Sequence, residues 1–329
     1  MGLPGTPASR ASRCLNKAQV TTVKDPKGKT ISLVLGSGGA RGLAHIGVIR
    51  VLEAQGWKIG AIAGSSMGAL IGGFYAAGKL DDYVDWVQAL TEFNVLRYLD
   101  IAWGGAGVIK GEMLMDTLQE FVGSHRIEDL PIPLTVVATD VLTRKEVWLN
   151  RGDLFEAIRA SVAVPTIFTP RLIDGRPLLD GGILNPVPIA PTLQDRTDAI
   201  IAVSLSGVET RLGGKNRHET RQETRKLPRN RYHKQIEDFV EQLQERLGLG
   251  EEKAQEGPSL SLTDAALLSL DAMQASIARS MLAAYPPDLL IEIPINTCGA
   301  HEFYRAREAI EAGEYWARQA LERFSGSDH

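Results

Sequence analysis

The chain has 329 residues, of which 44% are hydrophobic and 23% are charged, and its formal net charge is −4. These values are typical of a globular protein with one large or two small domains, and the slight acidic excess argues against nucleic acid as the main partner. Its two cysteines, Cys14 and Cys298, are too few for a disulfide scaffold or a cysteine-rich zinc site. No apolar run reaches the roughly 20 residues of a membrane-spanning helix, and the N-terminus has no apolar signal-peptide core. We therefore expect a cytoplasmic protein.

Residues 1–30 are predicted to form a disordered basic leader. The segment is rich in small residues, proline and glycine, and it has six basic residues against one acid, Asp25. Two other interpretations stay open. Met1-Gly2 together with Thr6 fits the N-myristoylation pattern, and the scarcity of acids fits a transit peptide.

From residue 31 onward, short apolar runs alternate with helical patterns. The runs predict strands at 31–35, 61–63, 134–138, 200–205 and 289–293, and the helical patterns lie at 41–55, 69–77, 113–122, 155–161, 264–284 and 301–323. This alternation predicts an α/β fold whose largely parallel sheet is covered by helices on both faces.

The segment 36–42, with the sequence GSGGARG, joins the first predicted strand to the first predicted helix. A loop of this composition presents several backbone N–H groups to one anion. It does not complete the dinucleotide-binding pattern G-x-G-x-x-G, because Arg41 stands at the third glycine, and it lacks the Lys-Ser/Thr ending of a phosphate-binding P-loop. The remaining interpretation is an oxyanion hole, which the serine one strand later supports.

That serine lies in the segment 64–68, GSSMG, which matches G-x-S-x-G between a predicted strand and a predicted helix. The glycines permit a sharp turn that exposes the hydroxyl of Ser66, and the N-terminus of the next helix favours developing negative charge. Ser66 is therefore the candidate nucleophile. The alternative is a glycine-rich turn with an inert serine.

Two residues are candidates for the base that activates Ser66. In α/β-hydrolases a histidine follows the serine and the acid in the sequence, and among the six histidines only His301 has this order and lies near a predicted strand end. The segment 179–188, LDGGILNPVP, offers Asp180 instead, on a turn where two glycines leave the carboxylate little steric cover. A hairpin turn without a catalytic role is the alternative interpretation of this segment.

Residues 207–258 interrupt the alternation of strands and helices and are predicted to be a charged insertion. Its part from 211 to 234 has nine basic and two acidic residues, and an amphipathic helical pattern follows. The apolar positions of that pattern are Ile236, Phe239, Val240, Leu243 and Leu247. One interpretation is a surface insertion whose helix packs on the domain. The other is a lid or a membrane-facing element, because basic residues beside an apolar helical face suit anionic lipid surfaces.

Together, the glycine loop, the G-x-S-x-G serine and the Asp-Gly-Gly segment resemble, in this order, the motifs of the patatin-like phospholipase family. The resemblance extends to 138–140, ATD, and to 160–168, ASVAVPTIF, and it covers most of residues 31–206. It is closest to bacterial members related to neuropathy-target-esterase-like lysophospholipases. Ser37 departs from the pattern, since many relatives have another glycine there.

The resemblance implies a three-layer α/β/α catalytic domain over residues 31–325 and a Ser–Asp dyad without a catalytic histidine. By this resemblance Ser66 is the nucleophile and Asp180 is the base, which needs partial desolvation to raise its basicity. The amides implied for the oxyanion hole are those of Gly38, Gly39 and Arg41.

The activity that the resemblance implies is hydrolysis of fatty-acyl esters of phospholipids or lysophospholipids through an acyl-enzyme, with neither a metal nor an organic cofactor. We expect the Arg41 side chain to pair with a nearby carboxylate or helix end, and contact with a lipid head group is the alternative. Peripheral membrane association through the leader or the insertion is also expected. Two other functions stay open: a histidine-dependent hydrolase using Ser66 and His301, and a non-catalytic lipid-binding regulatory protein.

Overall fold

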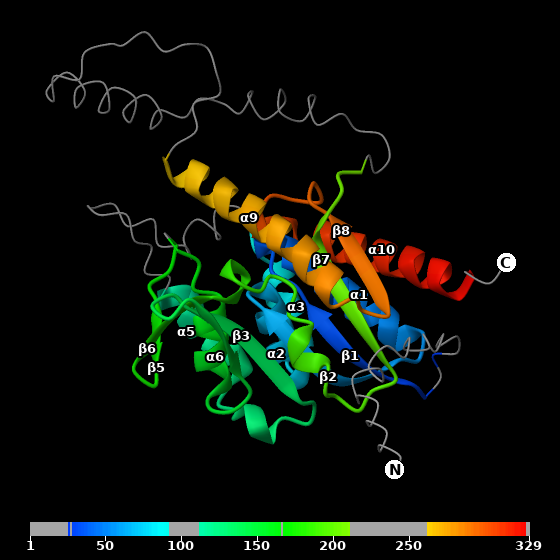
Figure 1. Cartoon of the computed structure of the whole chain (residues 1–329), viewed down its shortest axis with the longest axis horizontal. Helices are drawn as coiled ribbons and strands as arrows, with labels where there is room; N and C mark the ends of the chain where they lie inside the picture. Colours follow the sequence, from blue (N-terminus) through cyan, green and yellow to red (C-terminus); the bar gives the residue numbers. More distant parts are fainter. Residues whose placement is uncertain (1–25, 27, 92–111, 166, 211–261, 327–329) are drawn as a thin grey trace, which may run out of the picture. The chain divides into compact units, whose positions relative to one another are not determined.

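The structure is a computed structural model that describes residues 26, 28–91, 112–165, 167–210 and 262–326 (Figure 1). It divides into two units, one formed by Met1–Val208 with Leu270–His329 and the other by Glu209–Ser269. Residues 1–25 and 27 of the predicted leader and residues 211–258 of the predicted insertion lie outside the described residues, whereas Thr30, assigned to the leader, begins strand β1. The fold below is that of the first unit.

The first unit is built on one eight-stranded sheet in the order β5-β6-β3-β2-β1-β7-β8, with β4 pairing to β3. The strands are β1 (Thr30–Leu35), β2 (Lys58–Ser65), β3 (Leu134–Asp140), β4 (Lys145–Leu149), β5 (Arg171–Ile173), β6 (Arg176–Asp180), β7 (Ala199–Gly207) and β8 (Leu289–Pro294). Strands β1, β2, β3, β7 and β8 run parallel, whereas β4, β5 and β6 pair antiparallel. The predicted, largely parallel sheet is therefore confirmed.

Helices cover both faces of this sheet. They are α1 (Ala44–Ala54), α2 (Met67–Ala76), α3 (Leu80–Gln88), α5 (Glu112–Val122), α6 (Leu154–Ser161), α9 (Leu262–Ala284), of which the part from Leu270 belongs to this unit, and α10 (Ala306–Gly326). In Figure 1, α9 crosses in front of β7, whereas α1 and α10 lie behind the sheet.

The alternation of side chains along β1 shows why there are three layers. Leu33 and Leu35 point into the larger core, which contains apolar residues of α1, α2 and α10. Val34 points to the opposite face, where it belongs to a smaller cluster with Ala278 of α9. Because successive strand residues face opposite sides, an apolar strand such as β1 requires cover on both, which gives the α/β/α arrangement.

Four elements of this unit were not predicted. Helix α3 and the strands β4, β5 and β6 are absent from the sequence-based expectation. The three strands are short and partly exposed, with polar residues among the apolar ones, so they give no continuous apolar run. They nevertheless form the antiparallel edge of the sheet, and β6 carries Asp180.

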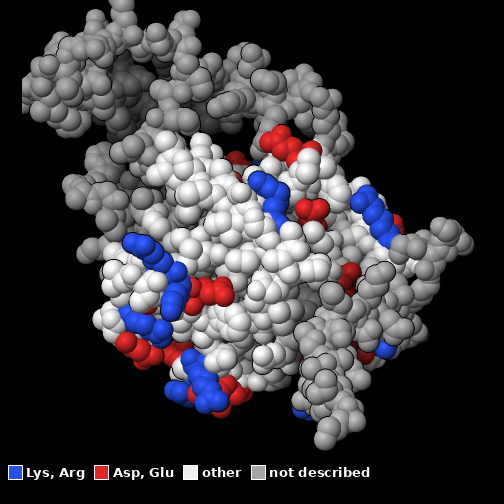
Figure 2. Space-filling view, viewed as in Figure 1, with Lys and Arg blue, Asp and Glu red and all other residues white. Residues whose placement is uncertain are grey.

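The surface of the described residues carries charges of both signs. On the face shown in Figure 2, uncharged residues predominate, and basic and acidic side chains lie close together in several places. In the part of the chain that the structure describes, no helix combines the length and the apolar character needed to cross a membrane.

Candidate active site

Ser66 lies at the corner where β2 ends and α2 begins, with φ 54° and ψ −123°. A positive φ is uncommon for a residue with a side chain and costs on the order of 1–3 kcal/mol. Neighbouring glycines make the corner possible. A Cβ on Gly64 would lie 2.6 Å from Ala69 Cα, and one on Gly68 would overlap the carbonyl group of Leu35. The corner thus holds the Ser66 hydroxyl at the carboxyl end of β2.

The backbone of Ser66 is fixed by Ser161, at the end of α6. Ser66 N–H donates to Ser161 Oγ at 2.9 Å, and the Ser161 hydroxyl donates to the Val137 carbonyl at 2.6 Å. All three groups are buried. Ser161 therefore ties the strained corner to β3, and its bond occupies the Ser66 N–H, so this N–H is not a donor for an oxyanion.

The register of the sheet brings Asp180 next to Ser66. In β3, Val137 pairs with Ser65 of β2, and the next residue, Ala138, pairs with Asp180 of β6. Because β4 pairs along the other edge of β3, β2 and β6 share one edge, and β6 ends where β2 ends. The last residue of β6 and the residue after β2 therefore meet.

At this meeting point the Ser66 hydroxyl donates to Asp180 Oδ2 at 2.6 Å, and the N–H of Gly182 donates to Asp180 Oδ1 at 2.7 Å. Both carboxylate oxygens thus have a donor. The hydroxyl is held on the carboxylate before any substrate is present, which is the geometry required of a nucleophile and its base.

The surroundings of Asp180 differ from the sequence-based expectation in two ways. The residue is not part of a hairpin turn, because it ends β6 and caps the 3₁₀ helix η4 (Gly181–Ile183), while the hairpin turn lies between β5 and β6. The expectation of a carboxylate with little steric cover is also wrong, since Asp180 is 0% exposed, whereas this burial agrees with the desolvation that the resemblance implies. Its two glycines are what allow this burial: a Cβ on Gly181 would overlap Val137, and one on Gly182 would overlap Ser37.

Burial changes the acidity of Asp180. Desolvation raises the pKa of this carboxyl to about 6, while its hydrogen bonds from Ser66 and from the Gly182 N–H act in the opposite direction. A buried carboxylate is a stronger base than an exposed one because its charged form is poorly solvated. At neutral pH Asp180 is still mainly ionised, and it holds a proton more readily than an ordinary aspartate.

The glycine loop packs against the Ser66 corner, since a Cβ on Gly42 would overlap the Met67 side chain. Its backbone N–H groups divide into two sets. Those of Ser37 and Ala40 donate to backbone carbonyls at 2.8 Å. Those of Gly38 and Gly39 have no acceptor among the described residues, which is the state expected of donors kept for a ligand oxygen. The third implied donor, Arg41, lies inside the 3₁₀ helix η2 (Gly39–Leu43).

The side chain of Arg41 pairs with a carboxylate, as predicted. Its Nη2 lies 2.5 Å from Asp271 Oδ1 of α9, and its Nε donates to the Gly38 carbonyl at 3.2 Å. His45 supports the other end of the loop, because its Nε2 donates to the Gly36 carbonyl at 2.8 Å. Burial lowers the pKa of His45 to about 4, so this imidazole is neutral at physiological pH.

The other candidate base, His301, is exposed in the connection between β8 and α10. The side-chain partner of the Ser66 hydroxyl is Asp180. In the described ranges, no cluster of three or more His, Cys, Asp or Glu residues could hold a metal ion.

Sequence reasoning missed three residues that contact this site. Ser161 was part of a recognised motif but had no assigned role, and Asp271 and Gln274 lie on a helix far along the chain. Gln274 accepts a hydrogen bond from Ser37 Oγ at 3.2 Å. The motif around Ser161 was the one available signal, because nothing in the local sequence of α9 connects it to a loop more than 200 residues earlier.

Known proteins resemble this chain over the residues that form the site. The family model for patatin-like phospholipases matches residues 33–193, which contain the glycine loop, Ser66 and Asp180. An NTE family protein of Mycobacterium tuberculosis is 40% identical over 344 residues, covering 93% of this chain and 95% of that protein. The chain belongs to the patatin-like phospholipase family.

Two further relatives are much longer than the shared region. "Lysophospholipase NTE1" of Kluyveromyces lactis is 30% identical over 192 residues, which are 56% of this chain and 13% of that protein. "Neuropathy target esterase sws" of Drosophila persimilis is 33% identical over 170 residues, which are 49% of this chain and 12% of that protein. The resemblance to the patatin-like family and to its neuropathy-target-esterase branch is thereby confirmed, and it places the chain in a family of lipid hydrolases.

Proposed function

We propose that this patatin-like protein is a serine lipid acyl hydrolase in which Ser66 attacks a fatty-acyl ester and Asp180 serves as its base. The observation that carries the proposal is the 2.6 Å hydrogen bond from Ser66 Oγ to Asp180 Oδ2. It is made at a strained strand–helix corner and within a buried site. Membership in a phospholipase family supports a lipid ester as the substrate.

In the first half of the reaction, Ser66 Oγ forms a bond to the ester carbonyl carbon while its proton passes to Asp180 Oδ2. The carbonyl oxygen becomes an oxyanion, which accepts hydrogen bonds from the N–H groups of Gly38 and Gly39. The N–H of Arg41 lies within η2, where the i to i+3 pattern directs it at the Gly38 carbonyl, so it is not part of this set. Each such donor is worth roughly 3–4 kcal/mol of transition-state stabilisation. The intermediate then collapses, the ester C–O bond breaks, and protonated Asp180 returns the proton to the leaving alcohol.

In the second half, water takes the place of the leaving alcohol. Asp180 accepts a proton from this water while the water oxygen attacks the carbonyl carbon of the acyl-enzyme. The same donors hold the second oxyanion. Collapse releases the fatty acid and returns the proton to Ser66 Oγ. A pKa of Asp180 near 6 suits both steps, because the group is ionised in the resting enzyme yet holds a proton long enough to deliver it.

The substrate class proposed is a phospholipid or a lysophospholipid. The yeast relative is named as a lysophospholipase, and the matching family model is described as patatin-like phospholipase. Both names point to glycerolipid acyl esters.

The test is hydrolysis by the purified full chain of phosphatidylcholine, phosphatidylglycerol and their lyso forms, with release of fatty acid as the readout. Ser66→Ala and Asp180→Asn are expected to lower the rate by at least about a hundredfold, as is usual for removal of a nucleophile or its base. His301→Ala is the matched control and is expected to keep wild-type activity.

Loss of activity in His301→Ala would favour a histidine-dependent hydrolase. A wild-type chain in which Ser66 does not react with a fluorophosphonate probe would favour a non-catalytic lipid-binding protein.

The proposal includes peripheral association with a membrane surface, because the substrate is held in a bilayer. The sequence segments expected to provide it are residues 1–30 and the insertion 207–258, in which the part from 211 to 234 is rich in basic residues. Removal of residues 211–258 keeps β7 intact, since this strand ends at Gly207. We expect this deletion to lower sedimentation with phosphatidylglycerol vesicles, and unchanged binding and activity would contradict the association through the insertion.

A further inference from the structure

The glycine loop, residues 36–42, which is the proposed oxyanion hole, is held in place by a part of the chain that the family model does not cover. The model matches residues 33–193, yet three of the contacts that hold the loop come from beyond residue 270. They are Asp271 of α9 on Arg41, and the carbonyls of Ile295 and Ala300, which follow β8. We call these contacts the brace of the loop. These residues belong to the same unit as the sheet.

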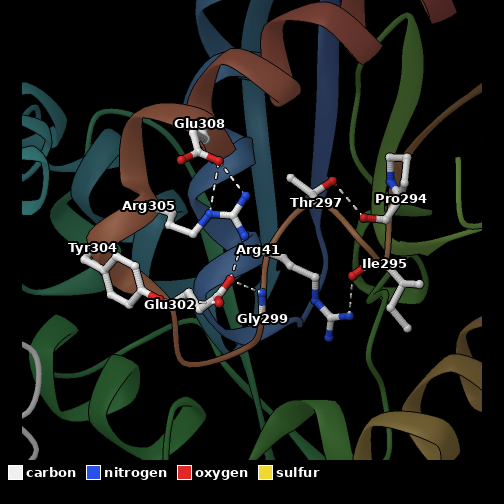
Figure 3. A network of polar contacts seen from close by, with 9 residues as sticks. All are labelled: Arg41, Pro294, Ile295, Thr297, Gly299, Glu302, Tyr304, Arg305 and Glu308. Carbon is white, nitrogen blue, oxygen red and sulfur yellow. Dashed lines mark hydrogen bonds and ion pairs between the residues drawn. The ribbon is translucent and has the colours of Figure 1, made fainter. Parts of the chain in front are cut away.

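Arg41 is the centre of this brace. Its side chain is 4% exposed, and each end of its guanidinium has a partner: Nε donates to the Gly38 carbonyl, Nη1 to the Ile295 carbonyl at 3.5 Å, and Nη2 to Asp271. Figure 3 shows the guanidinium next to Ile295 in the connection that follows β8. Asp271 is the charged partner within reach, so it sets the rotation of the guanidinium plane.

The bond from Arg41 Nε to the Gly38 carbonyl has a consequence for the next residue. The peptide joining Gly38 to Gly39 is planar and trans, so its C=O and its N–H point in opposite directions. Whatever holds the Gly38 oxygen on one side therefore aims the Gly39 N–H to the other. This N–H is one of the two that have no acceptor among the described residues.

Two adjacent glycines cannot hold that peptide by themselves. Gly39 has φ +57°, and glycine moves freely between this region and others. The peptide on the far side of Gly39 is fixed by the bond from Ala40 N–H to the Ala300 carbonyl, 2.8 Å long. The peptide on the near side is held at the Gly38 carbonyl, which is the N-cap carbonyl of η2 and also accepts from Arg41 Nε.

The Ala300 side of the brace is itself secured. Glu302 accepts from the Gly299 N–H at 2.7 Å and from Arg305 Nη1 at 2.7 Å (Figure 3). The turn carrying Ala300 is thus tied to the 3₁₀ helix η7 (Phe303–Arg305), which directly precedes α10. The contact between Arg41 and Asp271 is less enclosed, because 31% of the Asp271 side chain is accessible to solvent.

We propose that Asp271 is a positioning residue for catalysis: it orients the Arg41 guanidinium, which fixes the peptide between Gly38 and Gly39 and thereby aims the Gly39 N–H at the oxyanion. The inference rests on the proposed hydrolase function and adds to it a residue from α9. It assigns the Arg41 side chain to the loop and not to a lipid head group, in agreement with its burial and its three protein partners.

The test compares Asp271→Ala with the wild-type chain and with Asp82→Ala, which removes a carboxylate from a surface ion pair on α3. Two measurements are made: steady-state hydrolysis of a p-nitrophenyl ester, which has no phosphate, and inhibition by an alkyl trifluoromethyl ketone, whose adduct with serine resembles the tetrahedral intermediate. Complete loss of one oxyanion donor lowers kcat by about 10²–10³-fold, so a misaimed donor is expected to lower kcat by about 10- to 100-fold.

A positioning role also predicts how KM and the Ki of the ketone respond to Asp271→Ala. KM should change by less than about twofold, and the ketone Ki should rise by the same factor as kcat/KM falls, because transition-state analogues track transition-state binding. The Ki reports only on folded enzyme, so a variant that is merely less stable keeps the wild-type Ki. Arg41→Lys, which keeps the charge but has no fork to bridge Gly38 and Asp271, should behave like Asp271→Ala.

Three outcomes overturn the inference. The first is a kcat of Asp271→Ala within twofold of the wild type. The second is a fall in activity with an unchanged Ki. The third is an effect on KM for phospholipids that is absent with the p-nitrophenyl ester, which would assign Arg41 to a head group. Failure of the hydrolase proposal itself is recognised separately, since the wild-type chain would then show no Ser66-dependent hydrolysis.

Discussion

Replacing Asp180 by asparagine should stabilise this protein at alkaline pH and much less at acidic pH. The carboxylate is fully buried, and desolvation raises its pKa from 3.8 to about 6. A shift of two pKa units corresponds to about 3 kcal/mol. The ionised carboxylate therefore destabilises the folded state by about this amount. Asparagine is uncharged and does not destabilise the folded state in this way.

The sign follows from proton binding. Between pH 3.8 and about 6 the folded state keeps a proton on Asp180 that the unfolded state has lost. Stability conferred by this group is therefore complete below pH 3.8 and declines as the pH rises toward 6. Above this window the wild type should be less stable than Asp180→Asn by up to about 3 kcal/mol, or roughly 6 °C in Tm for a large domain.

Thermal unfolding of both proteins between pH 4.5 and 8 measures this. The difference in Tm, Asp180→Asn minus wild type, should grow with pH and level off above about pH 6.5, given a pKa near 6. Ser66→Ala removes a hydrogen bond that favours the ionised carboxylate and should therefore raise the pKa of Asp180 further. The difference in Tm between the chains with and without Asp180→Asn, measured in the Ser66→Ala background, should then keep growing to higher pH than in the wild-type background. A Tm difference that stays constant across the range would refute the assignment of a desolvated, ionised Asp180.

Three further predictions concern the same site. The kcat/KM of the wild type should fall tenfold per pH unit below about pH 6, because protonated Asp180 cannot accept the Ser66 proton, as a pH profile with an uncharged ester will measure. Ser161→Ala should leave the buried Ser66 N–H unpaired, which costs about 1–3 kcal/mol, and should slow fluorophosphonate labelling. Gly68→Ala should abolish labelling, because its Cβ would overlap the Leu35 carbonyl.

Each of these has its own control and contrary outcome. A pH profile that stays flat to pH 4.5 would contradict a base with a raised pKa. Ser280→Ala removes a hydroxyl that donates to the Ser276 carbonyl of its own helix, α9, and should leave labelling unchanged, so equal effects at both serines would argue against the role of Ser161. Gly60→Ala, whose Cβ would have 3.3 Å to its nearest neighbour, a side-chain methyl, should be tolerated far better than Gly68→Ala.

The core of the fold was predictable because its strands are apolar on both faces. Strands β1 and β7 are mainly apolar and almost entirely buried, and such strands are typical of a buried parallel sheet. The boundaries were less accurate: the predicted strand at 61–63 is β2 from Lys58 to Ser65. Strands β4, β5 and β6 escaped prediction because an antiparallel edge can leave one side exposed, so their sequences mix polar and apolar residues.

Some residues of the candidate site could likewise be predicted from the sequence and others could not. Ser66 and the glycine loop stand out in the sequence because close packing and positive φ angles require glycine at fixed spacings. The surroundings of Asp180 did not, since its burial comes from the registers of β2, β3 and β6. Asp271 carried no signal at all, because a lone aspartate on a helix gives no indication of what it contacts.

The amino-acid sequence by itself determined the order of the motifs, the candidate nucleophile and the α/β class of the fold, and it left two candidates for the base, Asp180 and His301. These depend on local rules, namely glycine at tight corners and apolar runs in buried strands. Only the tertiary structure decided that Asp180 is enclosed and meets Ser66 at 2.6 Å, and that Asp271, on a helix beginning after residue 260, contacts Arg41 of the glycine loop. Desolvation and hydrogen bonding act through space, between residues that more than 100 positions of chain separate, so no local pattern encodes them.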